Sequence, residues 1–226
     1  MIQTPKINLI HGDCMEHLRQ TPDNHYQLAI VDPPYGININ MNMARRAGRI
    51  KIHKEKKWDS DIPEDDYFIE LARVSENQII WGGNYFPLPL TKSWIFWDKE
   101  VPAGVDFADG ELAWTSFDKT LVKARLPYSG FRGSDNGGKI HPTQKPVALY
   151  KWLLTNYAKP GDKIIDTHGG SMSSAIACFD LGFDLDLTEL DADYYRDGVA
   201  RFERHKAQGQ LFHVPKPELP KPIELF

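Results

Sequence analysis

The sequence is poor in cysteine: it has two in 226 residues, Cys14 and Cys178. Both lie among apolar neighbours, and so few cysteines exclude a disulfide-stapled scaffold. We therefore expect reduced core residues in a cytoplasmic protein. The eight histidines are scattered, and no spacing of Cys and His is typical of a zinc site. The sequence predicts no metal centre.

Long apolar runs are also missing. No segment approaches the roughly 20 apolar residues of a membrane-spanning helix, and residues 1–6 lack the pattern of a signal peptide. We therefore expect no membrane contact. Hydrophobic residues make up 41% of the chain and charged residues 26%, which are ordinary values for a globular protein. The length suits one α/β domain, or one domain with a large insertion.

A general excess of positive charge is absent, because the net charge is −4. One segment departs from this balance: residues 45–57 hold seven basic residues against a single acid, Glu55. Such a segment is either a solvated loop or a contact to a phosphate backbone, and both hold if the loop becomes ordered on nucleic acid. The candidate nucleic-acid-binding residues are Arg45, Arg46, Arg49, Lys51, Lys54, Lys56 and Lys57.

One stretch joins a buried strand to a polar turn. Residues 28–31 read Leu-Ala-Ile-Val, and Asp32-Pro33-Pro34-Tyr35-Gly36 follows directly. A short apolar run bounded by turn residues is typical of a buried parallel strand, and open α/β sheets bind ligands beyond the carboxyl ends of such strands. Ionised Asp32 only accepts hydrogen bonds, Pro33 offers a rigid carbonyl and Tyr35 offers a flat face. Together they can hold a planar heterocycle with an exocyclic NH2, although an ordinary proline turn fits the same residues.

The rest of the chain alternates strand and helix patterns. The sequence predicts strands at 6–10, 28–31, 78–81, 93–97, 163–166 and 184–188, and a pair of strands at 111–116 and 119–123 around a turn at 117–118. It predicts helices at 15–20, around 67–74 after an opening Pro63, at 147–157 after an opening Pro146, and at 173–181. Residues 126–140 read as a loop, and 210–226 as a proline-rich, extended tail.

Two further motifs have a use for a charged ligand. Thr143 and Lys145, in His141-Pro142-Thr143-Gln144-Lys145-Pro146, precede a helix, a place that favours anions such as a carboxylate; a cap plus a surface charge is the plainer alternative. Asp13 follows the first strand and is a ligand contact or a helix cap.

The last part of the chain has a nucleoside-pocket pattern. Asp166 ends a strand, a turn of small residues follows, and Glu189 ends the next strand 23 positions after Asp166. This resembles the dinucleotide fingerprint, in which the second acid holds ribose hydroxyls. The glycines do not match that fingerprint, however, and a carboxylate facing the loop suits a cationic amine. The pattern favours an amino-acid nucleoside over a pyrophosphate.

Taken together, the three motifs resemble the S-adenosylmethionine-dependent DNA methyltransferases that modify adenine N6 or cytosine N4. The order, with Asp32-Pro33-Pro34-Tyr35 first and the loop from Asp166 last, is similar to the β-type arrangement, and the size resembles stand-alone enzymes of bacteria and their phages, including restriction-modification systems. The resemblance covers residues 7–206. It implies an α/β, Rossmann-like fold with permuted motif order, in which the strand before Asp32 lies beside the strand before Asp166.

The resemblance also implies roles for residues. The catalytic set is Asp32, Pro33, Pro34 and Tyr35. The set that binds S-adenosylmethionine is Asp13, Thr143, Lys145, Pro146, Asp166, His168, Gly170, Ser171, Glu189 and Asp191, with Thr143 and Lys145 at the methionine carboxylate and Glu189 at the ribose. The implied partner is double-stranded DNA, and a homodimer is one option. The catalytic domain would consist of 1–35, an inserted target-recognition region with sheet elements at 36–140, and a cofactor part at 141–209, before the tail at 210–226.

The implied reaction is direct methyl transfer to a flipped-out base. Asp leading the motif favours adenine N6; cytosine N4 and RNA are the alternatives of the same chemistry. Two departures weaken the resemblance at the cofactor loop. Met172 stands where the family usually has glycine and is expected to block a positive φ or a close approach to the ligand. Leu187-Thr188 replaces a frequent glycine before the acid. A non-enzymatic DNA-binding protein on a decayed methyltransferase fold is therefore the rival from another class.

Overall fold

The central apolar stretch forms strand β2 (Tyr26–Val31), which ends directly before Asp32. The computed structural model describes residues 4–37, 62–102, 104, 108–127, 140, 141 and 143–211. The other strands are β1 (Ile7–His11), β3 (Ser75–Trp81), β4 (Trp94–Asp98), β5 (Gly110–Thr115), β6 (Val122–Arg125), β7 (Lys163–Asp166) and β8 (Asp184–Glu189). The helices are α1 (Cys14–Gln20), α2 (Asp65–Val74), α4 (Val147–Tyr157), α5 (Ser173–Leu181) and α6 (Ala192–Leu211), with a 3-10 turn, η2 (Gly83–Tyr85).

The strands form one sheet in the order β1-β8-β7-β2-β3-β5-β4-β6. The five strands from β1 to β3 in this order run parallel, and β2 pairs with β7 through Leu28 opposite Ile164 and Ala29 opposite Ile165. The first motif and the last motif therefore lie on neighbouring strands, although more than 120 residues separate them in the chain. This confirms the expected Rossmann-like sheet with permuted connectivity.

One expectation about pairing is wrong. Strands β5 and β6 were expected to pair with each other around the turn at 117–118, but β4 lies between them. Strand β5 has β3 on one side and β4 on the other, so both of its edges are occupied, and β6 pairs in parallel with the free edge of β4. The edge of β5 that could have paired with β6 is paired with β4, and the spacing of residues within the two strands does not reveal this partner.

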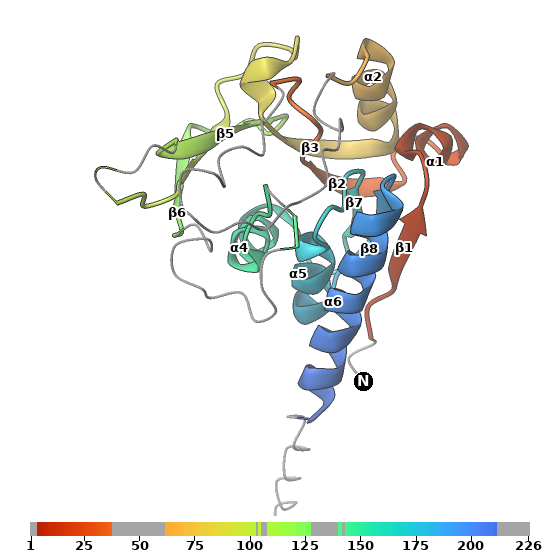
Figure 1. Cartoon of the computed structure of the whole chain (residues 1–226). Helices are drawn as coiled ribbons and strands as arrows, with labels where there is room; N and C mark the ends of the chain where they lie inside the picture. Colours follow the sequence, from red (N-terminus) through yellow and green to blue (C-terminus); the bar gives the residue numbers. More distant parts are fainter. Residues whose placement is uncertain are drawn as a thin grey trace, which may run out of the picture.

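Helices cover both faces of the sheet, with α1 and α2 on one side and α4, α5 and α6 on the other (Figure 1). Strand β2 serves both cores: Leu28 and Ile30 pack with residues of α4 and α5, whereas Ala29 and Val31 pack with Leu18 and residues of α2. A strand buried on both faces must be apolar at every position, which explains the continuous run that precedes Asp32. Each fully buried aliphatic side chain contributes about 1.5–3 kcal/mol.

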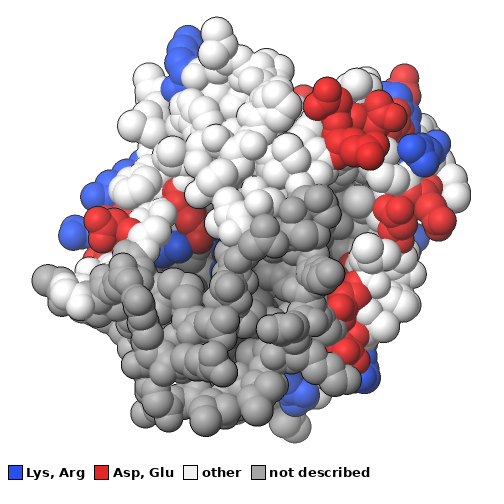
Figure 2. All heavy atoms as spheres, turned by 45° about the horizontal axis from the view of Figure 1, so that its top comes forward, with Lys and Arg blue, Asp and Glu red and all other residues white. Residues whose placement is uncertain are grey.

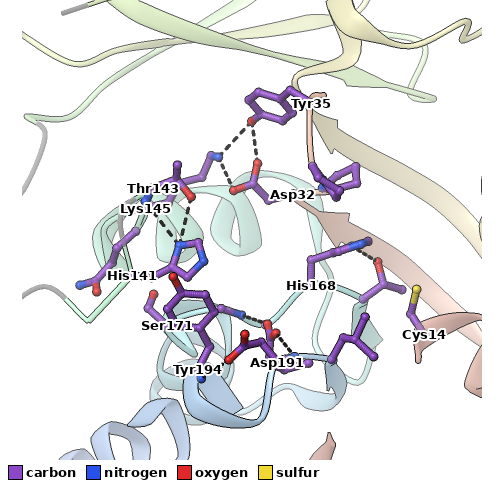
Figure 3. Close-up of a pocket in the computed structure, with 18 of the residues that line it drawn as sticks. Cys14, Asp32, Tyr35, His141, Thr143, Lys145, His168, Ser171, Asp191 and Tyr194 are labelled. Carbon is purple, nitrogen blue, oxygen red and sulfur yellow. Dashed lines mark hydrogen bonds and ion pairs between the residues drawn. The ribbon is translucent and has the colours of Figure 1, made fainter. Parts of the chain in front are cut away.

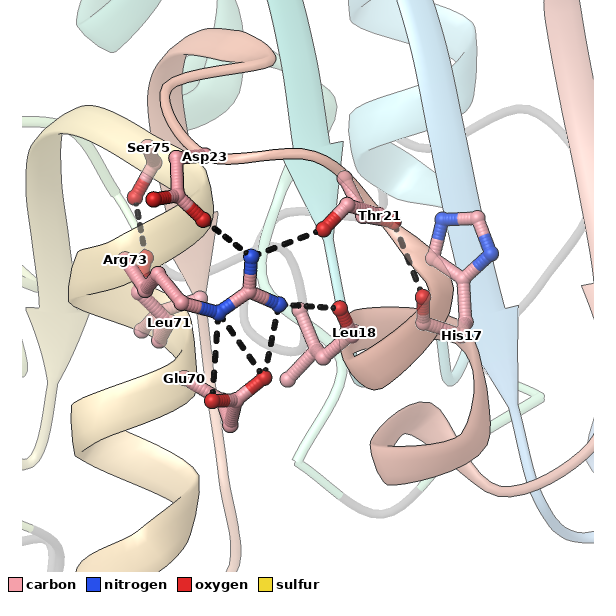
Figure 4. A network of polar contacts seen from close by, with 8 residues as sticks. All are labelled: His17, Leu18, Thr21, Asp23, Glu70, Leu71, Arg73 and Ser75. Carbon is pink, nitrogen blue, oxygen red and sulfur yellow. Dashed lines mark hydrogen bonds and ion pairs between the residues drawn. The ribbon is translucent and has the colours of Figure 1, made fainter.

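A polar network fastens α2 to the end of α1 (Figure 4). The guanidinium of Arg73 donates to the carbonyls of Leu18 and Thr21, each at 2.8 Å, and to Asp23 at 2.6 Å. The last carbonyls of a helix lack partners within the helix, so Arg73 supplies donors that α1 needs. Since Asp13 is the N-cap of α1, this network also fixes a residue at the ligand-binding edge of the sheet.

Two prolines stand outside the helices that they were expected to open. Helix α2 begins at Asp65, two residues after Pro63, and Pro146 is the N-cap of α4 rather than its first residue. Within the described residues no helix combines the length and the apolar character that crossing a bilayer requires. The basic residues at 45–57, most of the loop at 126–140 and residues 212–226 of the tail lie outside the described residues. The division into parts at 35, 140 and 209 stays a prediction.

Candidate active site

A cavity of about 570 Å³ opens at the carboxyl ends of β2, β7 and β8, and its lining brings the sequence motifs together (Figure 3). We name its two ends after the carboxylates that mark them. The Asp32 end contains Asp32, Pro33, Pro34, Tyr35, Glu111 and Lys145. The Glu189 end contains Thr167, His168, Gly169, Gly170, Ser171, Glu189 and Asp191. Asp13, Cys14, His141, Thr143 and Tyr194 are among the residues that line the cavity between and beside them.

At the Asp32 end, one carboxylate receives two donors. The hydroxyl of Tyr35 donates to Asp32 Oδ1 at 2.6 Å, and the ammonium of Lys145 lies 2.5 Å from Asp32 Oδ2. Each carboxylate oxygen has a second lone pair, so Asp32 keeps acceptor capacity for a ligand. Burial, followed by the nearby carboxylates of Asp32 and Glu111, raises the pKa of Tyr35 well above its ordinary value, so the phenol stays a donor.

Lys145 is the centre of a buried charge cluster. Its ammonium lies 3.1 Å from Glu111 Oε2 and 3.3 Å from the hydroxyl of Tyr35, and Lys99 lies 2.6 Å from Glu111 Oε1. Burial by itself would lower the pKa of Lys145, but Asp32 and Glu111 outweigh it and raise that pKa. Burial would raise the pKa of Glu111, and the two ammonium groups outweigh it and hold the pKa below its usual value. Lys145 and Glu111 are therefore both charged at neutral pH.

The ring of Tyr35 is fixed from behind. Tyr85 of η2 stacks on it with ring centroids 5.1 Å apart and planes at 14°. Gly82, with φ +67, passes so close that a Cβ there would lie 2.2 Å from Tyr35 Cε1, which only glycine avoids. The aromatic face that the sequence predicted is thus held by residues from the end of β3, the strand next to β2 in the sheet.

At the Glu189 end, a carboxylate is held by backbone N–H groups. Glu189 Oε2 accepts from Gly170 N at 2.7 Å and Glu189 Oε1 accepts from Asp191 N at 2.8 Å. Asp191 in turn accepts from the backbone N–H of Asp193 and Tyr194 at the start of α6. Burial raises the pKa of Glu189. These bonds fix both oxygens and leave each with a second acceptor position.

Asp166 supports the loop and is not among the residues that line the cavity. Its oxygens accept from His168 N at 3.0 Å and from the Ser174 hydroxyl at 2.5 Å, and its side chain is fully buried. Burial raises the pKa of Asp166 to about 7. Burial also lowers the pKa of His168 to about 4, so this imidazole is neutral at pH 7.

Met172 overturns one expectation. It was expected to block a positive φ, yet its φ is +59, the left-handed conformation that glycine usually supplies. Its side chain is fully buried and points away from the cavity toward α6, where a Cβ on Gly198 would lie 2.6 Å from Met172 Cγ. The glycine that the loop lacks is therefore matched by a glycine in the helix that faces it. Leu187 is accommodated by a glycine in the same way: it lies against Gly169, where a Cβ would be 2.2 Å from Leu187 Cδ2.

The remaining predicted residues fall into two groups. Asp13 Oδ1 accepts from Met15 N at 2.9 Å, so Asp13 caps α1 and also lines the cavity. Thr143 lines it beside His141, with 3.1 Å between Thr143 Oγ1 and His141 Nδ1. Pro146, like Asp166, is not among the lining residues, and the basic set at 45–57 lies outside the described part of the chain.

Sequence reasoning missed four residues that shape the cavity. They are Glu111, Lys99, Tyr85 and Tyr194; the last packs its ring against His141 with centroids 4.3 Å apart. A signal existed for one of them: Glu111 is an acid at the start of an otherwise apolar strand, Glu111-Leu112-Ala113-Trp114. Among the described residues, no group of three or more His, Cys, Asp or Glu could hold a metal ion.

On the face that Figure 2 shows, charged side chains are unevenly distributed over the described surface. Acidic side chains gather on the side of α1 and α2, where the start of α2 exposes Glu64, Asp65 and Asp66. A wide area beside them is uncharged. The uncharged area and the acidic side chains beside it therefore give little attraction for a phosphate backbone.

Comparisons with known proteins agree with this geometry. A family model described as DNA methylase matches residues 89–200. DNA adenine methyltransferase YhdJ of Escherichia coli K12 is 22% identical over 258 residues, which cover 92% of this chain and 87% of the relative. Putative methylase YubD of the same organism is 22% identical over 227 residues, or 88% of this chain and 93% of the relative.

Solved structures share the fold. The complex of M1.HpyAVI with SAM has a TM-score of 0.59 at 18% identity and covers 86% of this chain and 99% of that one. PvuII DNA methyltransferase, which is cytosine-N4-specific, also has a TM-score of 0.59, at 14% identity, and covers 91% and 92%. Together with the motifs that meet in the cavity, these matches support the resemblance of the chain to the S-adenosylmethionine-dependent DNA methyltransferases of the N6-adenine/N4-cytosine family.

Proposed function

We propose that this DNA methyltransferase transfers the methyl group of S-adenosylmethionine to the exocyclic N6 of adenine in duplex DNA. The observation that carries the proposal is that the acceptors of the Asp32 end and the carboxylate of the Glu189 end line the same cavity. An amino nucleophile and a methyl donor bound at these two ends would share one cavity, and direct transfer requires such proximity.

The Glu189 end suits the methyl donor. Glu189 has one free acceptor position on each oxygen for the two ribose hydroxyls. Gly170 has φ +48, and a Cβ there would be in ordinary van der Waals contact with His141 at 3.7 Å; the glycine leaves this place free, so a ligand can approach its backbone. His168, Ser171 and Asp191 line this end, and Asp13 and Thr143 line the cavity beside it. We assign Thr143 to the methionine part of the cofactor. S-adenosylmethionine supplies an electrophilic methyl group on a sulfonium sulfur.

Two of the proposed cofactor residues act through others. Asp166 shapes the loop through His168 N and Ser174, and Pro146 starts the helix behind Lys145. Lys145 itself is committed to Asp32 and Glu111, so we place its function at the Asp32 end rather than at the methionine carboxylate.

The Asp32 end suits the target base. A base-modifying enzyme must take the base out of the duplex, and stacking on Tyr35 would contribute about 1–3 kcal/mol. Asp32 and the carbonyl of Pro33 accept hydrogen bonds from the two N–H groups of the amino group, and Pro34 keeps the turn rigid. This draws the nitrogen lone pair out of ring conjugation. As the nitrogen gains the methyl group it loses a proton, for which Asp32 is the nearest base.

Adenine is favoured because Asp leads the catalytic motif and because the relative YhdJ is named an adenine methyltransferase. Cytosine N4 is the alternative, since the PvuII enzyme of the same fold is cytosine-specific. Contact between DNA and the seven basic residues of 45–57, assembly into a homodimer and a place in a bacterial or phage restriction-modification system remain part of the proposal.

The test is methyl transfer from labelled S-adenosylmethionine to unmethylated duplex DNA, followed by digestion to nucleosides. We expect label in N6-methyladenine, its loss in Asp32→Ala, and full activity in the control Asp118→Ala, whose carboxylate is exposed and lies outside the cavity. Label in N4-methylcytosine would overturn the choice of base. Label in RNA alone would overturn the substrate, and absence of both transfer and cofactor binding would overturn the enzyme.

A further inference from the structure

We propose that Glu111 is a positioning residue of the Asp32 end: it holds the Lys145 ammonium on Asp32 and keeps that ammonium away from the amino group to be methylated. The inference rests on the proposed function, because it assigns a task within the methyl-transfer site. Glu111 belongs to none of the three sequence motifs and comes from the start of β5, two strands away from β2 in the sheet.

The Lys145 ammonium is surrounded by oxygen atoms. Lys145 Nζ has three N–H donors, and three acceptors surround it: Asp32 Oδ2 at 2.5 Å, Glu111 Oε2 at 3.1 Å and the hydroxyl oxygen of Tyr35 at 3.3 Å. Its side chain is 3% exposed, so solvent does not replace a lost partner. Within the described residues the contacts to Asp32 and Glu111 are ion pairs, and Glu111 Oε2 receives no hydrogen bond, so charge attraction holds the ammonium beside Glu111.

A Lys145 ammonium displaced from Asp32 would interfere with the reaction. The nucleophile of the reaction is the lone pair of an amino nitrogen, and an ammonium N–H that turned toward it would bind that lone pair and oppose its attack. A Lys145 that left Asp32 would also remove the charge that balances this carboxylate in a buried place. Asp32 can accept a hydrogen bond from the amino group only if its carboxylate stays in place. A shift of the Lys145 ammonium would therefore disturb both Asp32, the acceptor, and the amino nitrogen, the nucleophile.

Glu111 acts on Asp32 through Lys145, because both of its carboxylate oxygens face lysines. Glu111 Oε1 lies 2.6 Å from Lys99, which directly follows the neighbouring strand β4, and Glu111 Oε2 faces Lys145. Both oxygens are therefore committed to lysines, and the Lys99 ammonium, 14% exposed, fixes the direction of the carboxylate. Two carboxylates and two ammonium groups alternate in the order Asp32, Lys145, Glu111, Lys99, which balances the charge within the wall of the cavity.

The experiment compares Glu111→Gln with the wild-type protein in single-turnover methyl transfer and in equilibrium binding of S-adenosylmethionine. Glutamine keeps the shape but removes the charge, so we expect the transfer rate at saturating substrates to fall about 100-fold, the order of loss for a catalytic group misplaced by about 1 Å. Cofactor affinity should stay within about threefold. Glu203→Gln, an exposed acid of α6 that pairs with Lys206, is the matched control and should change neither.

Variants of Lys99 separate positioning from a structural role. Lys99→Gln should lower the transfer rate in the same direction as Glu111→Gln but by less, because Lys99 reaches Asp32 only through Glu111 and Lys145. Lys99→Arg keeps the charge and should restore most of the rate. Equal thermal stability of Lys99→Gln and Lys99→Arg, together with different rates, is the result that a merely structural role would not produce.

Two results would overturn the inference. One is a transfer rate of Glu111→Gln close to that of the wild type; the other is a loss of cofactor affinity with an unchanged rate, which would make Glu111 a ligand contact. If the wild-type protein itself transfers no methyl group, the proposed function fails, and a crystal structure of Glu111→Gln then decides separately. The inference requires Lys145 Nζ to have left Asp32 Oδ2 in that structure, and an ammonium that remains in place contradicts it.

Discussion

The Asp32 end of the cavity is held by charged side chains, whereas the Glu189 end is held by backbone conformation. Asp32, Lys145 and Glu111 fix one another through ion pairs. At the other end, the backbone N–H of Gly170 binds Glu189, and Met172 takes a left-handed φ. The first arrangement depends on the identity of each side chain. The second depends on the path of the chain, and more than one residue can produce that path if its neighbours make room.

The comparison predicts different responses to pH. The ion pairs keep the pKa of Lys145 raised and that of Glu111 lowered, so these two groups of the Asp32 end stay charged through the neutral range. Asp166, which supports the loop of the Glu189 end from outside the cavity, has a pKa raised by burial from 3.8 to about 7, so it titrates in the neutral range. Since the folded state binds this proton more tightly than the unfolded state, the contribution of Asp166 to stability falls as pH rises from about 4 to about 7.

The largest expected effect follows from that titration. Asp166→Asn cannot ionise, so its free energy of unfolding relative to the wild type should rise between pH 4 and pH 8, by up to about 4 kcal/mol at 1.4 kcal/mol per pKa unit. Urea unfolding at several pH values measures the difference, and Asp118→Asn at an exposed site is the control. A difference between Asp166→Asn and the wild type that does not change with pH would remove the contrast between the two ends.

Glu189→Gln tests the Glu189 end by itself. The variant removes a charged acceptor, and hydrogen bonds to charged groups contribute about 1.5–3 kcal/mol, so the Kd for S-adenosylmethionine should rise about 10-fold to 100-fold. Titration calorimetry measures the Kd. The transfer rate at saturating cofactor should change little. A lost rate with an unchanged Kd would show that the two ends are not separate in function.

Gly198→Ala tests whether packing sets the path of the loop. The new methyl group would lie 2.6 Å from Met172 Cγ, and overpacking of this kind costs about 1–3 kcal/mol of unfolding free energy. The double variant Gly198→Ala, Met172→Gly removes the clash and should recover part of the loss, which a double-mutant cycle in urea detects. Additive effects of the two changes would mean that Gly198 does not accommodate Met172.

The smallest expected effect concerns the stacked tyrosines. Tyr85→Leu removes the ring behind Tyr35, and such aromatic pairs contribute about 0.5–1.5 kcal/mol beyond burial, so the single-turnover rate should fall about threefold to tenfold. Tyr85→Phe keeps the ring and should keep the rate. Equal rates for Tyr85→Leu and Tyr85→Phe would show that Tyr35 needs no support from this side.

The sequence predicted what local patterns determine. The apolar run before Asp32, the helix after Lys145 and the strand before Glu189 are where the patterns place them, because burial on both faces of a sheet and helical spacing leave a direct record in consecutive residues. The neighbourhood of β2 and β7 followed from the resemblance of the motif order, and the register of the two strands confirms it.

What the sequence did not reveal depends on distant partners. Glu111 meets Lys145 only because β5 joins the sheet beside β3, and the pairing of β6 with β4 follows from which edges are free. Met172 was misjudged because its φ alone was considered, whereas Gly198, 26 residues later, gives its side chain a place in the core. Local residue preferences describe the cost of a conformation and not the packing that offsets this cost.

The most direct test of the account measures binding and transfer on one variant, Asp32→Asn. The change removes the charge that accepts the amino protons and leaves the Glu189 end untouched. We predict a Kd for S-adenosylmethionine within about threefold of the wild type and a loss of N6-methyladenine formation of about 100-fold to 1,000-fold, the range for removing one preorganised electrostatic group. Cofactor affinity that is lost together with transfer, or transfer that survives, would contradict it.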